Sequence, residues 1–403
     1  MRKLDRREFI GAGLLAAAAA AAGVEIGRRD GAPAPPPPPA AGRGPITKLI
    51  DIGPEGVIRP GSAQDLRYAS NTRYFADTGT PWIRMWADWP SLQPRASHGP
   101  GDPHSPGYFR LRALDAQIAL ANARGLKVML MPYRFPDWVN GGRERAAAVA
   151  PGSRRAPEYL LPASDPYGPS SAWAGFFRFL FDRYHLGRTG GGPTVHAFEL
   201  VNEPNLQLWP QRGIAAEIAR LLATAQAISA EFGHSTPLLA PSLSDSDASA
   251  TRYDEFVPAL LDACAAIGYR PHAQQAWSHH NYADVERRLT DTRTQAIRRL
   301  LAGRWDGMRE GDAPIVYVTE GGARLSRMHA LYPDEHPREA QARCVRHAWT
   351  LHNSDPAAGA GVAMLAQYLL YADPNYDSGL LDPYPSRVKR PAYEAWKAFH
   401  VDV

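Results

Sequence analysis

Several features that define large classes of protein are scarce in this sequence. Only two of the 403 residues are cysteine, Cys264 and Cys344, which excludes a disulfide framework. After residue 22 no apolar run is long enough to cross a bilayer, so we expect no stable membrane span in the mature chain. Neither sign of charge dominates, since 45 lysine and arginine residues stand against 41 acidic ones. What remains, with 44% hydrophobic residues, is the composition of a globular protein.

The small excess of positive charge lies at the N-terminus. Residues 1–45 contain seven basic and four acidic residues, and so hold three of the four net positive charges. Residues 46–403 are therefore nearly neutral, and their charge gives no reason to expect a nucleic-acid partner.

Residues 1–23 have the organisation of an export signal. Arg6 and Arg7 precede a weakly apolar stretch that ends in seven alanines. The segment resembles a twin-arginine signal, in which the two arginines are followed, one residue later, by phenylalanine and an aliphatic residue, here Phe9 and Ile10. The resemblance implies delivery by the twin-arginine export machinery to the periplasm or the cell exterior, with the signal cleaved or kept as an anchor. The alternative is an alanine-rich helix with chance arginines.

Residues 24–45 are interpreted as a proline-rich linker. They include the five consecutive prolines of 35–39, and this composition favours an extended spacer that cannot pack a core. The folded part of the chain is then a single domain, residues 46–403.

Apolar runs and helical patterns alternate along this domain. Strands are expected at 48–52, 82–86, 126–131, 195–201, 237–240, 276–282, 315–319 and 361–370. Helices are expected at 110–124, 171–184, 214–232, 253–267, 284–303, 337–352 and 391–399. Eight strand-like runs alternating with helices predict an α/β fold of the (β/α)₈ barrel type, with a doubly wound sheet as the alternative. Long loops rich in glycine and proline follow several of the strands, which in a barrel favours a cleft for an extended ligand.

Two glutamates stand where an apolar strand meets a loop. Glu203 follows the fourth run, within the tripeptide Asn-Glu-Pro at 202–204, and Glu320 ends the seventh run, within Thr-Glu-Gly at 319–321. A charge in such a position is costly unless it has a task or a partner. Hydrolysis of a glycosidic bond requires two carboxyl groups that flank the bond. Strands four and seven of a barrel would bring this pair together across its mouth.

The two tripeptides closely resemble the signatures of the clan of retaining glycoside hydrolases that have (β/α)₈ barrels. That clan includes the cellulase-like family 5 and the xylosidase- and iduronidase-like family 39. The resemblance implies that Glu203 is the acid/base and Glu320 the nucleophile. It also implies that Asn202 contacts the 2-hydroxyl of the sugar and holds the nucleophile.

Further positions agree with this resemblance. Arg84 ends the second run, where the cellulase-like family has an arginine that bonds its nucleophile. His280 and Tyr282 match a His-x-Tyr motif whose phenol orients the same nucleophile. The sequence departs from the clan at Val201, where tryptophan often precedes Asn-Glu-Pro, and at 367–368, Gln-Tyr, where many members have a tryptophan platform. The particular family and the preferred sugar stay open.

Other residues of these strands and loops receive weaker assignments. Trp138 and Trp209, in the loops after strands three and four, are the leading candidates for rings that stack on a sugar. Trp86, Trp89 and Trp277 are further candidates, each of which can equally be a core residue. Glu199 is interpreted as a structural carboxylate that bonds a neighbouring strand or Arg84.

The sequence thus predicts an exported retaining glycoside hydrolase that cleaves O-glycosidic bonds of an oligo- or polysaccharide by double displacement, without a metal or organic cofactor. A metal hydrolase on the same barrel would need a cluster of histidines, whereas the adjacent His279 and His280 point to opposite faces of a strand. Two alternatives stay open: a catalytically silent carbohydrate-binding barrel, and a transglycosylase that uses the same glutamates.

Overall fold

The computed structural model describes residues 46–62, 65–67, 71–141, 162, 165–355, 359–373 and 376–399. The predicted signal and linker lie outside the described residues, as does part of the loop after the third strand, and predictions that concern them stay predictions.

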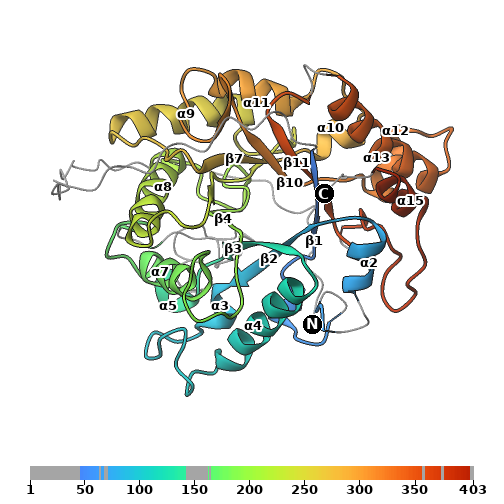
Figure 1. Ribbon diagram of the computed structural model, residues 1–403. Helices are drawn as coiled ribbons and strands as arrows, with labels where there is room; N and C mark the ends of the chain where they lie inside the picture. Colours follow the sequence, from blue (N-terminus) through green and yellow to red (C-terminus); the bar gives the residue numbers. More distant parts are fainter. Residues whose placement is uncertain are drawn as a thin grey trace.

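Eight parallel strands close into a barrel around which the helices form an outer ring (Figure 1). The strands are β1 (Thr47–Asp51), β2 (Trp82–Asp88), β3 (Lys127–Tyr133), β4 (Ala197–Glu199), β5 (Leu238–Leu239), β7 (Gln275–His280), β10 (Val316–Glu320) and β11 (Val362–Tyr368). The sheet closes because β1 pairs with both β2 and β11, while β7 pairs with both β5 and β10. Each of the eight expected runs overlaps one of these strands, so the predicted (β/α)₈ fold is confirmed.

The helices follow the predicted order, with short additional ones. The longer helices are α4 (Tyr108–Ala123), α7 (Ala172–Tyr184), α8 (Ile214–Glu231), α9 (Tyr253–Ala266), α11 (Arg293–Leu301) and α13 (Pro337–Ser354). The shorter ones are α1 (Glu55–Ile58), α2 (Thr72–Asp77), α3 (Trp89–Leu92), α5 (Asp137–Asn140), α10 (Tyr282–Glu286), α12 (Leu325–Leu331) and α15 (Pro391–Lys397). Three two-residue strands complete the set: β6 (Leu243–Ser244), which pairs with the end of β7, and the antiparallel β8 (Arg309–Glu310) and β9 (Ala313–Pro314). No helix among the described residues combines the length and the apolar character needed to cross a membrane.

The single helix expected at 284–303 is wrong, because the chain breaks there into α10 and α11. Arg288 has a φ of +52°, a left-handed conformation that ends a helix. The side chain of Thr292 then accepts the N–H of Gln295 at 3.2 Å and starts α11 as its N-cap. Helical spacing of apolar residues continues across the break, which is why the sequence pattern did not show it.

Inside the barrel, a small apolar layer lies beneath a polar one. The apolar layer contains one or two side chains from most strands: Leu49, Met129, Ala197, Leu239, Ala276, Met364 and Ala366. Side chains two residues further along a strand point to the same face. In β1 that residue is Asp51, and in β4 it is Glu199, both fully buried. The strands therefore deliver carboxylates to the carboxyl end of the barrel, above an apolar floor.

Candidate active site

Arg84 on β2 is fully buried at the carboxyl end of the barrel. Its guanidinium donates to Glu199 on β4 at 2.6 Å, to Glu320 on β10 at 2.6 Å, and to Asp51 on β1. Burial disfavours the cation, but the three carboxylates outweigh this effect and raise the pKa of Arg84 well above its usual value. The contact between Arg84 and Glu320 is the one that the resemblance implied, and Glu199 bonds Arg84 as expected.

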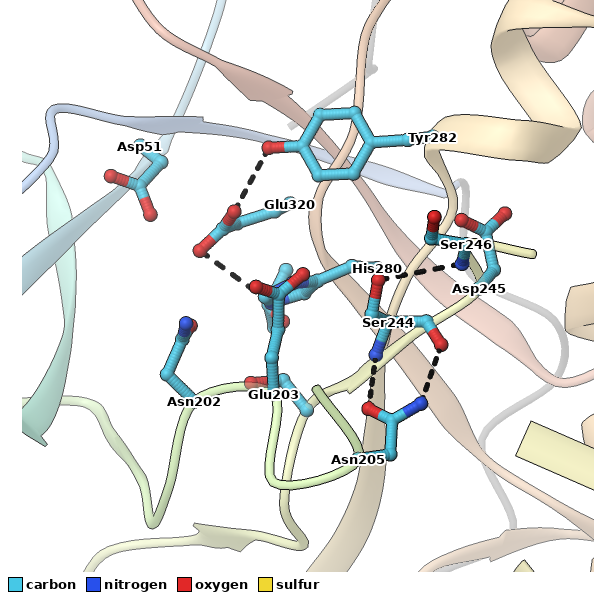
Figure 2. A network of polar contacts seen from close by, with 12 residues as sticks. Asp51, Asn202, Glu203, Asn205, Ser244, Asp245, Ser246, His280, Tyr282 and Glu320 are labelled. Atoms are coloured by element: carbon cyan, nitrogen blue, oxygen red, sulfur yellow. Dashed lines mark hydrogen bonds and ion pairs between the residues drawn. The ribbon is translucent and has the colours of Figure 1, made fainter. Parts of the chain in front are cut away.

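Glu320 at the end of β10 is nearly buried, with 5% of its surface exposed. The phenol of Tyr282 donates to Oε2 at 2.9 Å, while Arg84 donates to Oε1 (Figure 2). Burial raises the pKa of Glu320 to about 7, against the opposing effects of His280 and Arg84, which favour the ionised form. Two donors therefore orient a carboxyl group that is poised to ionise near neutral pH.

Glu203 lies in the loop after β4, with 15% of its side chain exposed. Its φ of +45° is a left-handed conformation that residues other than glycine rarely adopt. The backbone holds it there: the N–H of Glu203 donates to the Ser242 carbonyl at 2.8 Å, and the N–H of Ser242 donates to the Val201 carbonyl at 3.1 Å. Strained residues of this kind cluster at functional sites, where the surrounding structure fixes the direction of a side chain. In Figure 2 the carboxyl group of Glu203 points toward His280 and Glu320.

His280 at the end of β7 lies between the two glutamates. Its Nδ1 is 3.0 Å from Oε1 of Glu203, and its Nε2 is 3.6 Å from Oε1 of Glu320. Burial lowers the pKa of His280, but the carboxylates of Glu320 and Glu203 outweigh burial, and the pKa is raised. One oxygen of each glutamate and one ring nitrogen of His280 all lie within 4.8 Å of one another. The fold thus brings together two carboxyl groups that are far apart in the sequence.

Asn202 is connected to Glu320, the candidate nucleophile, by Arg84, which donates a hydrogen bond to each of them. Its side-chain oxygen accepts from Arg84 at 3.0 Å, and its carbonyl accepts from the indole N–H of Trp209 at 2.9 Å. The residue that precedes Glu203 is therefore fixed on both sides, by the buried cation and by a loop tryptophan.

Trp209 is not the exposed ring that the sequence suggested. Only 3% of its surface is exposed, and it packs in the main core with Phe135 at a ring-centroid distance of 6.3 Å. Its indole supports Asn202, as described above, so its ring faces are covered by the protein. The assignment failed because a tryptophan in a loop can fold back onto the core when its N–H finds a buried acceptor.

Of the other candidate tryptophans, only Trp138 is partly exposed. Its indole donates to the Gln93 carbonyl at 3.0 Å, and its ring meets Trp89 edge-on at 5.8 Å. Trp86, Trp89 and Trp277 are buried. Trp138 is therefore the one tryptophan of the five candidates that keeps some surface for a ligand.

Sequence reasoning missed Asp51 and Tyr376. Asp51 ends the apolar run of β1, the same signal that drew attention to Glu203 and Glu320, and it accepts from Arg84 and from the indole of Trp86. Burial raises the pKa of Asp51, with Arg84 opposing. This carboxylate belongs to the same charge cluster as the candidate nucleophile.

The tyrosines form an aromatic wall beside Glu320. The ring of Tyr376 meets those of Tyr282 and Tyr368 at 5.1 Å in each case. Tyr368 ends β11 and is half-buried, at the position where many clan members were expected to have tryptophan. An aromatic ring is therefore present at this strand end in spite of the departure in sequence.

Two groups of side chains among the described residues have the spacing to hold a metal ion. The first is Glu203, His280 and Glu320, and the second is Asp245, His279 and Asp284. In the first group Glu320 already forms an ion pair with Arg84 at 2.6 Å. The positive charge of Arg84 would repel a metal cation bound beside it. The second group lies outside the site described here.

These features define a class: a closed (β/α)₈ barrel with two facing carboxyl groups at the carboxyl ends of strands β4 and β10. No protein-family model matches the sequence, and no curated protein sequence matches it. Solved structures that share the fold include a GH5_18 from Bifidobacterium longum subsp. infantis, with a TM-score of 0.54, 13% identity, and coverage of 88% of this chain and 78% of that one.

Two further solved structures have the same fold. The catalytic domain of Ignisphaera aggregans GH53 has a TM-score of 0.56 and 13% identity, covering 91% of this chain and 98% of that one. A GH5_18 from Streptomyces cattleya in complex with GlcNAc has a TM-score of 0.54 and 16% identity, covering 89% of this chain and 80% of that one. At these identities the likeness shows a shared barrel architecture.

Proposed function

We propose that the protein is a retaining glycoside hydrolase. The observation that carries the proposal is the placement of Glu203 and Glu320, one oxygen of each lying within 4.8 Å of the other at the mouth of the barrel. Retaining glycosidases have carboxyl groups about 5–5.5 Å apart, whereas inverting ones need roughly 6.5–9.5 Å to admit a water molecule. The narrow spacing favours a covalent glycosyl intermediate over direct attack by water.

In the first step, Glu320 attacks the anomeric carbon while Glu203 donates its proton to the departing glycosidic oxygen. Tyr282 and Arg84 hold the attacking carboxylate in one orientation, at 2.9 and 2.6 Å. Burial strengthens these contacts, because fixed donors act more strongly where the local dielectric is low. The bond from the anomeric carbon to the leaving oxygen breaks as the bond to Glu320 forms.

In the second step, Glu203 takes a proton from a water molecule that attacks the anomeric carbon and releases the sugar from Glu320. The partly exposed position of Glu203, beside the buried Glu320, suits a group that must exchange protons with solvent and leaving group. His280 contacts both carboxyl groups and compensates their charge as protons move between the steps.

A carbohydrate is the expected substrate. The solved GH5_18 structures include the one with GlcNAc and one from Bifidobacterium longum subsp. longum in complex with Manb1-4GlcNAc, so the shared architecture accommodates sugars in those proteins. In this chain, Tyr368, Tyr376 and Trp138 offer partly exposed rings near the barrel mouth, and flat rings suit the C–H faces of a sugar. Export by a twin-arginine signal is part of the proposal and rests on residues 1–23.

The test uses Glu320→Ala and Glu203→Ala on a panel of aryl glycosides. We expect Glu320→Ala to lower kcat by roughly 10⁴-fold or more, with partial rescue by azide, because azide can replace the missing nucleophile. Glu203→Ala should lower kcat/KM by about 10²–10⁴-fold, least for substrates with good leaving groups. Glu231→Gln, an exposed carboxylate paired with Arg178, is the matched control and should keep full activity.

Nuclear magnetic resonance of the first-formed product separates the mechanisms. A product with the anomeric configuration of the substrate supports double displacement, while an inverted product contradicts it. Binding of oligosaccharides without turnover across the panel, by a folded wild-type chain, would contradict hydrolysis and favour a binding barrel. Transfer to an added sugar in preference to water would favour the transglycosylase alternative.

A further inference from the structure

A second polar cluster lies next to the active site but faces away from it. Asp245 follows β6, His279 lies on β7 and Asp284 on α10. All three are buried, with exposures of 1%, 0% and 4%. One carboxylate oxygen of each aspartate and one ring nitrogen of His279 lie within 4.8 Å of one another.

The alternation of side chains along β7 separates this cluster from the catalytic one. His280 faces the barrel interior, where it contacts Glu203 and Glu320. His279, one residue earlier, points to the opposite face. There it meets β6, whose Leu243 pairs with it in the sheet. Figure 2 shows Asp245 on the far side of His280 from Asn202.

Backbone donors hold both carboxylates in place. Asp245 accepts the N–H groups of Ala283 at 2.8 Å and Asp284 at 3.1 Å, and Asp284 accepts those of Arg293 at 2.7 Å and Thr294 at 3.1 Å. The hydroxyl of Thr294 also donates to Asp284 at 2.8 Å. Each carboxylate can accept about four hydrogen bonds, so both keep free lone pairs. The contacts orient the two groups in the way that outer hydrogen bonds orient metal ligands.

His279 has no hydrogen-bond partner at either ring nitrogen among the described residues. Burial lowers the pKa of His279 and outweighs the opposing carbonyl of Leu243, which makes no hydrogen bond to the ring. A buried polar atom without a partner costs about 1–3 kcal/mol, and native proteins seldom leave one unsatisfied. Two carboxylates at this spacing also repel each other. One cation among the three groups would remove both costs.

We propose that Asp245, His279 and Asp284 bind a divalent transition-metal ion, with Zn²⁺ as the preferred ion. Imidazole nitrogen and carboxylate oxygen are both ligands of Zn²⁺, at about 2.0–2.2 Å. Two carboxylates balance the charge of the ion. A set with two oxygen ligands and no sulfur also accepts Mn²⁺.

The cluster borders a cavity on its Asp245 side. Asp245 lines a cavity of about 420 Å³, together with residues of α10 and α12 such as Tyr282 and Arg327. A preformed ligand set with satisfied outer contacts is what a metal site requires, and the cavity beside Asp245 is where an ion would enter. The ion would fix the start of α10, the helix whose first residue, Tyr282, donates to Glu320. Its role is structural, and the inference does not depend on the proposed glycosidase activity.

The test measures metal content and thermal stability of the full chain, purified without a metal-affinity tag. We expect about one equivalent of Zn²⁺ per chain after growth in Zn²⁺-supplemented medium. Chelation should lower Tm, and Zn²⁺ at about a hundredfold above its Kd should raise the Tm of the stripped protein by about 4 °C. These measurements need no variant, so they remain decisive if a substitution prevents folding.

Variants then locate the ion. Asp245→Asn and His279→Ala should each lower the metal content to below about a tenth of an equivalent and abolish the response to Zn²⁺. Asp262→Asn removes the same charge from an exposed aspartate that pairs with Arg304 outside the cluster, and it should keep the ion. Glu203→Gln should also keep it, because Glu203 belongs to the catalytic group.

Three results would overturn the proposal. The first is a wild-type chain that holds no transition metal and whose Tm responds to neither Zn²⁺ nor Mn²⁺. The second is equal metal content in wild type, Asp245→Asn and His279→Ala, which would place the ion elsewhere. The third is loss of the ion in Glu203→Gln alone. A response to Mn²⁺ equal to that for Zn²⁺ supports the site and changes only the preferred ion.

Discussion

At the scale of single residues, the charge balance around Arg84 governs the chemistry. One buried guanidinium faces Asp51, Glu199 and Glu320, so the carboxylates outnumber the cation. Burial raises the pKa of Asp51 and also that of Glu320, the latter to about 7, and the carboxylates raise the pKa of His280. These groups interact strongly, so each apparent pKa belongs to the cluster and not to one residue alone.

The pH profile of the free enzyme follows from this cluster. The nucleophile must be ionised, so kcat/KM should fall as pH drops below about 7, where Glu320 takes up a proton. Tyr282→Phe removes a hydrogen-bond donor to the ionised form and should move this acidic limb to higher pH. The measurement is kcat/KM on an aryl glycoside, taken across the acidic and neutral range.

The control is Tyr317→Phe, on the same strand as Glu320. Within the described part of the chain, the hydroxyl of Tyr317 donates to the sulfur of Met308 at 3.8 Å and not to Glu320. This variant should leave the limb in place. An unshifted limb in Tyr282→Phe would show that the phenol does not control ionisation of the nucleophile.

At the scale of elements, Lys48 connects β1 to the segment after α2 and to α15. Its ammonium on β1 donates to the Thr78 carbonyl after α2 at 2.8 Å and to the Trp396 carbonyl in α15 at 2.6 Å. The charge also lies 5.7 Å from the ring centres of Trp349 and Trp396. A fully buried lysine therefore connects elements that lie 348 positions apart in the sequence.

The stability contributed by Lys48 should depend on pH. Burial lowers its pKa from 10.5 to about 8, so the folded state binds the proton less tightly than the unfolded state does. The contribution is complete above about pH 10.5 and is lost as pH falls through 8. As pH rises from about 8 to about 10.5, the free energy of unfolding of the wild type should therefore increase by about 2 kcal/mol relative to that of Lys48→Met.

Urea unfolding at several pH values in this interval measures the difference. Lys397→Met is the matched control, because Lys397 is exposed and its bond to Asp77 raises the pKa instead of lowering it. A pH-independent difference for Lys48→Met would mean that the buried amine keeps its proton throughout the interval.

At the scale of the whole molecule, closure of the barrel completes the fold without covalent links between elements. Cys264 and Cys344 are both free and buried among the described residues, and burial raises the pKa of both thiols. A protein of this kind can fold before it leaves a reducing compartment. That property agrees with the proposed twin-arginine route, which carries folded proteins.

Export should depend on the first arginine pair alone. Replacing Arg6 and Arg7 together by lysine keeps the charge and should leave the protein in the cytoplasm, because the signal is recognised by its two arginines. The same replacement of Arg28 and Arg29, a second arginine pair in the predicted linker, should have no effect. Immunoblots of cell fractions measure the distribution, and equal export of both variants would rule out a twin-arginine signal.

The sequence alone was sufficient for the local features of this protein. Strand and helix periodicity needs only neighbouring residues, and the eight strands, the order of the helices and the strand-end positions of Glu203 and Glu320 followed from it. The broken helix around Arg288 and the buried ring of Trp209 did not, because each depends on partners that periodicity does not contain.

The tertiary structure decided everything that depends on closure of the barrel. Closure places Asp51, Glu199 and Glu320 around Arg84, and the burial that comes with it raises the pKa of Glu320 to about 7. Strand alternation already points His279 and His280 to opposite faces, but the fold decides what each meets: Asp245 and Asp284 for His279, and Glu203 and Glu320 for His280. The physical reason is that electrostatic interactions depend on distance in space, which the order of residues along a chain does not determine.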